Sequence, residues 1–305
     1  YNVVRDEDEQ DPDRRYKALF ATGGNDRYPY VSPDGFKWER VDVPPIPSGD
    51  TSHLTYDEIT EQFIATVKIR TRWGRSIWLS TSYDFIDWTE PVLIFHTDEI
   101  DTNNRRRRIR HVVEDPAYLT PHSVDKENYY AEVYKMSIMP YEGLYIGLPV
   151  LFNPSGPWGK GHTGINQAEL AVSRDLYNWN RVAGRDVFLG VLPWDGETYD
   201  TAQVIPCGRP IVRADLGEIW IYYDSCRFRS RKEDVDETHR KYFDEDLNAV
   251  CLAKLRMDGF VSLDALKKGT MLTRPFVLDR GDVYVNVESQ DGELLAEVVD
   301  ADTME

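Results

Sequence analysis

Short runs of apolar and aromatic residues alternate along most of the chain with residues that form turns. The runs are rich in Tyr, Val, Ile and Phe and are separated by Gly, Pro, Asn and Asp, which is typical of β-strands and not of helices. The pattern predicts strands at residues 16–21, 63–70, 77–80, 132–138, 143–151, 168–172, 203–213, 218–223 and 249–255. The chain is therefore expected to be all-β.

A seven-residue pattern, S-x-D-x-x-x-W, recurs along the chain. Its copies lie at residues 32–38, 82–88 and 173–179. A degraded copy at residues 256–262 keeps Asp258 and the turn but loses the tryptophan. Copies about 50 to 90 residues apart, each with several short strands and an outer hairpin, are typical of β-propeller blades.

The aspartate of each copy should form a tight turn, because its side chain can accept hydrogen bonds from the backbone just after it. We therefore expect equivalent outer turns at Asp34, Asp84 and Asp175. The tryptophans of the same copies should be largely buried between blades; they are Trp38, Trp88 and Trp179. Four blade-like units are visible and Tyr1 enters in the middle of one, so we predict a five-bladed β-propeller whose first blade is incomplete in this chain.

Two segments depart from the blade pattern. Residues 98–115 begin with acidic residues and are followed by Pro116, which predicts a helical insertion in a propeller of residues 1–269. The arginine-rich stretch 105–110 in it is interpreted as a solvated helix face or a partner for the acidic surface. Residues 270–305 predict a β-hairpin with an Asp-Gly turn, which either closes the propeller or begins a C-terminal β-sandwich.

The charge of the chain limits its partners. Fifty-three acidic and 36 basic residues give a net charge of −17, which argues against nucleic acid and anionic membranes. No apolar run approaches the roughly 20 residues of a membrane-spanning helix. The chain starts at Tyr1 with no visible signal peptide, and we interpret it as a fragment. Its location stays open: secreted or periplasmic if a signal peptide was removed, or cytoplasmic.

Three acidic residues stand at or just before the innermost strand of a predicted blade, where side chains would face a central funnel. They are Asp50, Glu132 and Asp200. Carboxylates that converge from different blades are what glycoside hydrolysis needs, with one as proton donor and one as nucleophile or base. Glu132 lies in an otherwise apolar and aromatic strand, which would raise its pKa and suit a general acid. The alternative is that each carboxylate caps a turn or pairs with a nearby arginine.

Further residues are candidates for binding the substrate by hydrogen bonds or ring stacking. They are His53, Tyr134, Glu169, Trp194, Gln203 and His239. Three widely spaced cysteines do not form a zinc motif, and no cofactor or metal is predicted, although a bound Ca²⁺ is left open. Motifs of nucleotide-binding enzymes, zinc proteases and serine hydrolases are absent from the sequence.

Four segments carry a resemblance to a known group of proteins. They are residues 11–19, 139–147, 170–176 and 258–265. In them the chain resembles bacterial five-bladed β-propeller proteins labelled as similar to the N-terminal domain of glycoside hydrolase family 32, which share the fold of families 43, 62 and 68. The resemblance implies a nucleophile or base, an auxiliary aspartate and a glutamic acid, which we assign to Asp50, Asp200 and Glu132.

The departures from that group concern the reaction. The N-D-P-N, R-D-P and E-C signatures of invertase-like enzymes are missing, and residues 114–116 only imitate one of them. Fructan chemistry is therefore not implied. The sequence favours a glycoside hydrolase-like enzyme that cleaves a poly- or oligosaccharide, and the alternative is a noncatalytic carbohydrate-binding propeller. The sugar, the linkage, the stereochemical outcome and the oligomeric state stay open.

Overall fold

The computed structural model describes residues 3–159, 161–235, 237–277, 283–290, 292–300 and 302. The chain divides into two compact units, Tyr1–Val261 and Ser262–Glu305. All strands and helices given below belong to the first unit.

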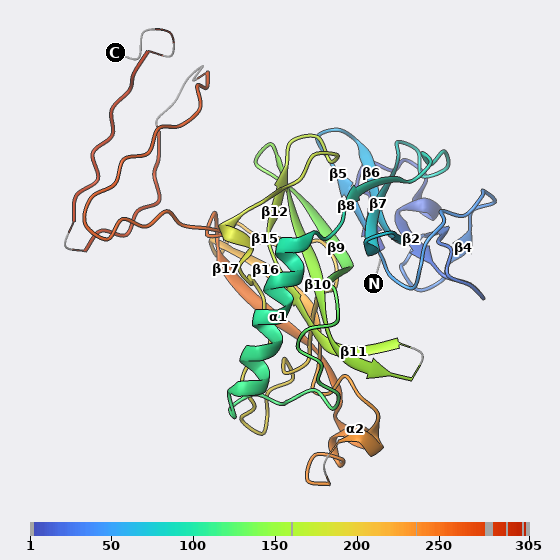
Figure 1. Ribbon diagram of the computed structural model, residues 1–305. Coiled ribbons are helices and arrows are strands. Elements are labelled where there is room, and N and C mark those ends of the chain that lie inside the picture. Colours follow the sequence, from blue (N-terminus) through green and yellow to red (C-terminus); the bar gives the residue numbers. More distant parts are fainter. Residues whose placement is uncertain are drawn as a thin grey trace. The chain divides into compact units, whose positions relative to one another are not determined.

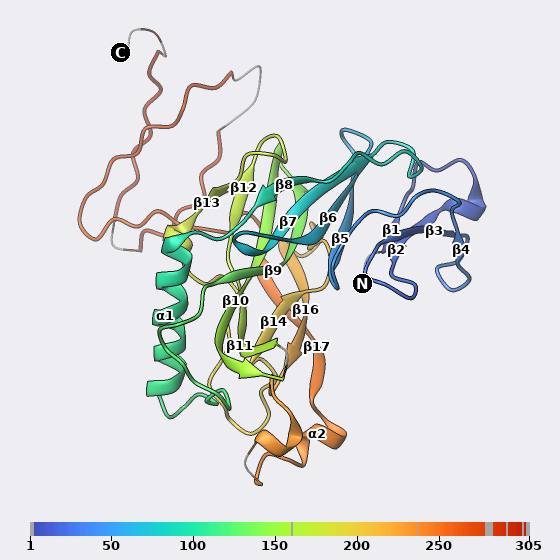
Figure 2. The same ribbon diagram turned by 45° about the vertical axis from the view of Figure 1, so that its right-hand side comes forward.

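Two four-stranded antiparallel sheets form the N-terminal part of this unit, and in each the strands pair in chain order (Figure 2). The strands of the first sheet are β1 (Val3–Arg5), β2 (Tyr16–Phe20), β3 (Tyr28–Ser32) and β4 (Glu39–Arg40). Those of the second are β5 (Ser52–Asp57), β6 (Gln62–Thr71), β7 (Gly74–Ser82) and β8 (Val92–Phe95). This consecutive pairing is the arrangement expected of a propeller blade.

A larger, nine-stranded sheet follows within the described residues. Its strands are β9 (Glu132–Tyr141), β10 (Leu144–Trp158), β11 (Gly161–Ala168), β12 (Ala171–Ser173), β13 (Asn180–Arg181), β14 (Gln203–Pro206), β15 (Ile211–Arg213), β16 (Glu218–Cys226) and β17 (Asn248–Arg256). The long strand β10 pairs with β9, β11 and β12, and a single parallel pair between Asn166 and Gln203 joins β11 to β14.

Each range that the sequence predicts as extended contains a strand, so the all-β prediction is confirmed. The number of blades and the closure of a ring stay predictions. Short helical turns connect the strands at η1 (Pro12–Arg14), η2 (Ala183–Arg185), η3 (Lys232–Asp234) and α2 (Tyr242–Glu245).

The three full copies of the repeat form the same turn, as predicted. In each copy the aspartate Oδ1 accepts hydrogen bonds from the backbone N–H groups two and three residues later, at distances of 2.7 to 2.9 Å. The serine two residues earlier donates its hydroxyl to the same carboxylate. The residue after the aspartate has a positive φ in every copy, at Gly35, Phe85 and Leu176.

The burial of the repeat tryptophans is less than predicted. Trp38, Trp88 and Trp179 are half-buried, whereas Phe85 and Leu176 are buried in the core. In the second and third copies the residue after the aspartate, which has a positive φ, occupies the core position. The indole N–H of Trp179 instead donates to the Leu176 carbonyl at 2.7 Å, which holds the ring along its own hairpin.

Helix α1 (Glu99–Glu114) confirms that the predicted segment is helical, and Asp98 and Asp101 form a capping box at its start. It packs along β10 (Figure 1). The interpretation of its arginines as a solvated face is wrong for two of them. Arg105 is fully buried and donates to backbone carbonyls, including that of Pro154 at 2.6 Å, and Arg108 pairs with the buried Glu169 at 2.7 Å. No helix in the described part of the chain is long and apolar enough to cross a membrane.

The core between the second sheet and β9–β10 positions the start of β9. Ile64 and Ile77 from β6 and β7 pack against Val133 and Ile138 of β9 and Leu151 of β10. Burial of such aliphatic side chains stabilises the packed arrangement by about 1.5 to 3 kcal/mol each. The first residue of β9 is thereby held against the β6–β7 hairpin.

The unit Ser262–Glu305 contains no strand in its described residues. Asp282 and Asp291, which would begin the first strand and form the turn of the predicted hairpin, lie outside the described residues. The hairpin therefore stays a prediction.

Candidate active site

Glu132 is the first residue of β9 and is only 8% exposed. Its Oε1 accepts the backbone N–H of Arg75 at 3.1 Å, and its Oε2 pairs with the Arg75 guanidinium group. Arg70 lies 3.5 Å from the same carboxylate and is itself exposed. Both arginines come from the β6–β7 hairpin, so this hairpin fixes the position of the carboxylate.

Gly74 makes this close approach feasible. It begins β7 with a φ of +80°, a conformation that residues with a Cβ rarely adopt. A Cβ at this position would overlap the carboxyl group of Glu132. The hairpin therefore needs glycine here both for its backbone conformation and for the space that the carboxylate occupies.

Glu132 opens on a cleft of about 840 Å³ between the β6–β7 hairpin, the start of α1, residues 128–130 and the β10–β11 hairpin. Aromatic side chains line it. Trp73 stacks on His96 with ring centroids 3.9 Å apart, Tyr129 contacts His162 edge to face at 4.9 Å, and Tyr130 is 74% exposed. Exposed aromatic rings of this kind provide apolar faces for a ligand that also forms hydrogen bonds.

Asp98 also lines the cleft, but its carboxylate already accepts hydrogen bonds from Arg185 and from the backbone at the start of α1. Two hydrogen bonds from Arg185, at 2.6 and 2.9 Å, and the helix-capping bond lower the pKa of Asp98 to about 2. It caps α1 and does not offer a free acid or base to the cleft.

Asp50 precedes β5, and its side chain is 61% exposed. It forms an ion pair with Lys68 of β6. Partial burial raises the pKa of Asp50, but the hydrogen bond from Lys68 and the charges of Lys68 and Arg75 outweigh this effect and lower it below its ordinary value. The carboxylate of Asp50 is therefore ionised at neutral pH.

The basic partners of Asp50 and Glu132, Lys68 and Arg75, both lie near the ring of Tyr134. Lys68 lies 4.1 Å and Arg75 5.9 Å from the centroid of Tyr134, whose ring contacts Phe152. The structure thus brings two of the predicted carboxylates to one cationic and aromatic cluster. Tyr134, one of the predicted binding residues, lies at its centre and is half-buried.

Asp200 makes its contacts elsewhere. Its carboxylate accepts the hydroxyl of Tyr223 at 2.6 Å and that of Ser225 at 3.2 Å, and Cys251 lies near the same oxygen. Among the described residues, no hydrogen bond or ion pair links it to Asp50 or Glu132. Its contacts join β16 and β17 to the loop before β14.

Two further candidates have no surface that could touch a ligand. His53 is fully buried and donates from Nε2 to the Ile138 carbonyl at 3.1 Å, and burial lowers its pKa to about 3. Glu169 is also fully buried and lies between Arg108 and Arg181, at 2.7 and 3.4 Å. Burial raises the pKa of Glu169, although the two arginines oppose this shift.

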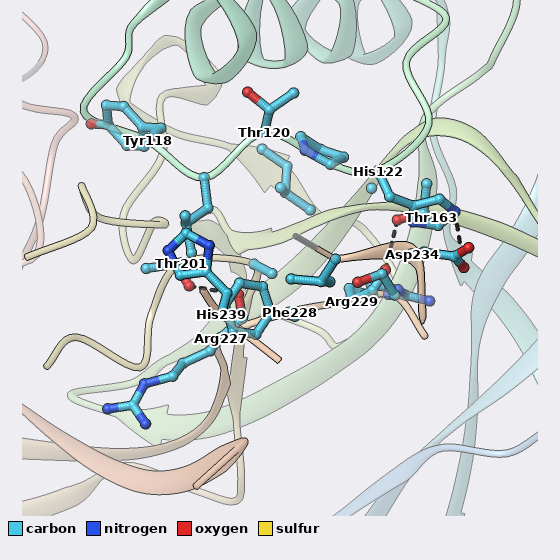
Figure 3. Close-up of a pocket in the computed structure, with 17 residues that line it drawn as sticks. Tyr118, Thr120, His122, Thr163, Thr201, Arg227, Phe228, Arg229, Asp234 and His239 are labelled. Atoms are coloured by element: carbon cyan, nitrogen blue, oxygen red, sulfur yellow. Dashed lines mark hydrogen bonds and ion pairs between the residues drawn. The ribbon is translucent and has the colours of Figure 1, made fainter. Parts of the chain in front are cut away.

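Of the remaining candidates, His239 lines a second pocket. A cavity of about 390 Å³ is lined by His239, Phe228, Arg229, His122 and other residues shown in Figure 3. Trp194 packs edge to face on His239 with centroids 5.6 Å apart, so it supports the wall of this pocket. Gln203, half-buried on β14, accepts a hydrogen bond from Asn166 at 3.0 Å.

Sequence reasoning missed the basic residues Lys68, Arg75 and Arg229 as well as Trp73. Lys68 had a local signal, since it stands between Val67 and Ile69 in a strand with several apolar residues, whereas β7 around Arg75 is half polar. Their convergence on Tyr134 has no sequence signal, because it depends on how separate sheets pack. Within the described residues, no group of three or more His, Cys, Asp or Glu side chains is placed to hold a metal ion.

No protein-family model matches the chain, and no curated protein matches it. Among solved structures, it is similar to an N-acetylgalactosamine deacetylase from F. plautii in complex with blood group B trisaccharide, with a TM-score of 0.50, 14% identity and coverage of 80% of this chain and 69% of that chain. This likeness shows a shared fold.

Two other solved structures are similar at lower TM-scores. One is a β-1,2-mannobiose phosphorylase from Listeria innocua, with a TM-score of 0.45, 16% identity and coverage of 78% of this chain and 52% of that chain. The other is a glycosyl hydrolase from Bacteroides ovatus, with a TM-score of 0.43, 13% identity and coverage of 81% and 63%. This chain therefore spans about half the length of the phosphorylase.

Proposed function

We propose that this protein is a glycoside hydrolase-like enzyme that acts on a poly- or oligosaccharide at the cleft of Glu132. The observation that carries the proposal is the position of this carboxylate: it is nearly buried, yet it opens on a large cleft lined by Trp73, Tyr129 and Tyr130. Support for a sugar ligand also comes from the F. plautii deacetylase, which shares the fold and was solved with a trisaccharide.

The proposal includes a five-bladed propeller related to the group labelled as similar to glycoside hydrolase family 32. The two consecutive four-stranded sheets and the equivalent turns at Asp34, Asp84 and Asp175 support it. In this proposal the first blade is incomplete, and residues 270–305 supply a hairpin that closes the ring or begins a sandwich.

The two carboxylates at the cluster take different roles in the proposed reaction. Asp50 is the nucleophile or base, because its lowered pKa keeps it ionised and its side chain is exposed to a substrate or water. Glu132 is the general acid: once the substrate displaces Arg75 from Oε2, the carboxylate takes up a proton from water and donates it to the leaving oxygen. The role of orienting or tuning these two carboxylates is assigned to Asp200 from the family resemblance, and its own hydrogen bonds are with Tyr223 and Ser225.

A panel of oligo- and polysaccharides tests the proposal by measuring the release of reducing ends. We expect at least one substrate to be cleaved, and Glu132→Gln to lower kcat by about 10² to 10⁴ while ligand binding is kept. Glu142→Gln is the matched control, because Glu142 lies exposed in the β9–β10 turn and should leave kcat unchanged.

The noncatalytic carbohydrate-binding propeller is the alternative. Its expected result is saturable sugar binding without turnover of any panel member, and binding that weakens when an aromatic residue of the cleft, such as Tyr130, is replaced by Ala. Glu132 forms an ion pair with Arg75. If this ion pair is still present when sugar is bound, the noncatalytic alternative is favoured.

A further inference from the structure

Three basic side chains crowd around the rings of Tyr134 and Phe152. Arg229 lies 4.2 Å from the Phe152 centroid and 5.2 Å from the Tyr134 centroid. Lys68 lies 4.1 Å from Tyr134, and Arg75 lies 5.4 Å from Phe152. They come from β6, β7 and the segment after β16, so the fold brings them together from distant parts of the chain.

This crowding of positive charge is costly as the structure stands. Nε and Nη1 of Arg229 are buried and have no hydrogen-bond partner among the residues that the structure describes. Burial lowers the pKa of Arg229, and the charge of Arg75 adds to this effect. Burial likewise lowers the pKa of Lys68, and both arginines add to that shift, although Asp50 opposes it.

The nearby carboxylates do not balance the three cations. Asp50 pairs with Lys68, and Glu132 pairs with Arg75. No ion pair in the described part of the chain is formed by Arg229. A buried guanidinium group without an anion is unfavourable, and a bound oxyanion would offset both the missing hydrogen bonds and the repulsion between cations.

We propose that this cluster binds the carboxylate of a uronic acid unit in the substrate, with Arg229 as the principal ligand and Lys68 and Arg75 beside it. The planar fork of a guanidinium group matches the two oxygens of a carboxylate, and the rings of Tyr134 and Phe152 lie next to the position of the anion. The sugar part of the inference rests on the proposed function. It restricts the substrate class to acidic glycans.

The cluster lies at the border of the core. The side chain of Asp50 is 61% exposed, and Arg75, Tyr134 and Arg229 are each partly exposed, whereas the Lys68 side chain is buried. The backbone of Arg229 is fixed by Thr163, which donates its hydroxyl to the Arg229 carbonyl at 2.6 Å, as Figure 3 shows. Thr163 of β11 therefore ties the segment after β16, which carries Arg229, to the neighbouring strand.

Binding of monosaccharide pairs that differ only in a carboxylate tests the inference without any need for turnover. Titration calorimetry of the full chain compares glucuronate with glucose and galacturonate with galactose. We expect binding of one uronate at least about tenfold tighter than its neutral counterpart, with the difference reduced by salt. Equal binding of both members of each pair would overturn the proposal.

Variants and inorganic anions complete the test. Arg229→Gln should weaken uronate binding about ten- to a hundredfold, Arg229→Lys should weaken it less, and the exposed Arg231→Gln should leave it unchanged. If Arg229→Gln does not fold, the comparison of uronate with neutral sugar and the Arg229→Lys variant still decide.

Phosphate or sulfate that binds as tightly as the uronate would assign the cluster to a free oxyanion and contradict the proposal. Uronate binding together with an inactive substrate panel would refute the proposed hydrolysis and leave this inference standing.

Discussion

Glu132 and Glu169 are both glutamates with two arginine neighbours, yet one opens on a cleft and the other is sealed in the core. Glu132 is paired with Arg75 and approached by the exposed Arg70, and Gly74 leaves room beside it. Glu169 lies between Arg108 of α1 and Arg181 of β13 with no exposed surface. The comparison shows that an arginine partner alone does not mark a carboxylate as part of a candidate site, and that Glu132 differs from Glu169 in its access to a cleft.

The largest expected effect on stability comes from removing the charge of the buried Glu169. Glu169→Gln leaves the buried Arg108 without its carboxylate partner, while Arg181 keeps its ion pair with Asp101, so it should lower the free energy of unfolding by about 3 to 5 kcal/mol. Denaturant unfolding measures the loss. Glu132→Gln should cost clearly less, because Arg70 is exposed to water. A larger loss for Glu132→Gln than for Glu169→Gln would reverse the comparison.

Gly74→Ala disturbs the position of Glu132 beside the cleft without removing any charge. The added Cβ must displace the carboxyl group of Glu132, and the φ of +80° adds about 1 to 2 kcal/mol of strain. A displacement of about 1 Å lowers kcat by about 10²-fold. Gly143→Ala serves as the control, since it also has a positive φ but open space around it, and it should reduce stability without changing kcat.

The fully buried His53 should make the stability of the protein depend on pH. Its folded-state pKa of about 3 lies below the ordinary value of 6.5, so the unfolded chain binds a proton that the folded chain does not. This contribution to stability is complete above pH 6.5 and should fall by about 1.4 kcal/mol per pH unit as the pH drops from 6.5 toward 3. His53→Gln should flatten this part of the profile. An unchanged slope in that variant would show that His53 titrates normally.

The smallest expected effect on stability concerns Asp50, on the open side. The side chain of Asp50 is exposed, so Asp50→Asn should lower the free energy of unfolding by less than Glu169→Gln does, although it removes the ion pair of the buried Lys68. The same variant should strongly reduce turnover if Asp50 is the nucleophile or base. Thermal melts and reducing-end assays on one preparation separate the two effects, and a large loss of stability would place Asp50 among the structural carboxylates.

Local features of the fold were predictable from the sequence because neighbouring residues determine them. The turns at Asp34, Asp84 and Asp175 need only a serine, an aspartate and the backbone between them. Helix α1 needs Asp98 at its start and Pro116 after its end. The strands follow from their composition in the same way.

The features that could not be predicted depend on contacts between distant segments. Arg105 is buried because carbonyls at residues 125, 126 and 154 surround it, and nothing near it in sequence indicates this. For the same reason the sequence made Glu132 a catalytic candidate and Glu169 a substrate-binding candidate without showing that only Glu132 opens on a cleft. Asp50 and Glu132 share a cluster only because β6 and β7 pack against β9.

A crystal structure of the Glu132→Gln variant soaked with an oligosaccharide tests the central claim most directly. The account predicts a sugar in the cleft of Trp73, Tyr129 and Tyr130, with its glycosidic oxygen within hydrogen-bond distance of residue 132 and Asp50 on the other side of the bond. A sugar bound only in the pocket lined by His122, Phe228 and His239, with the cleft at residue 132 empty, would contradict it.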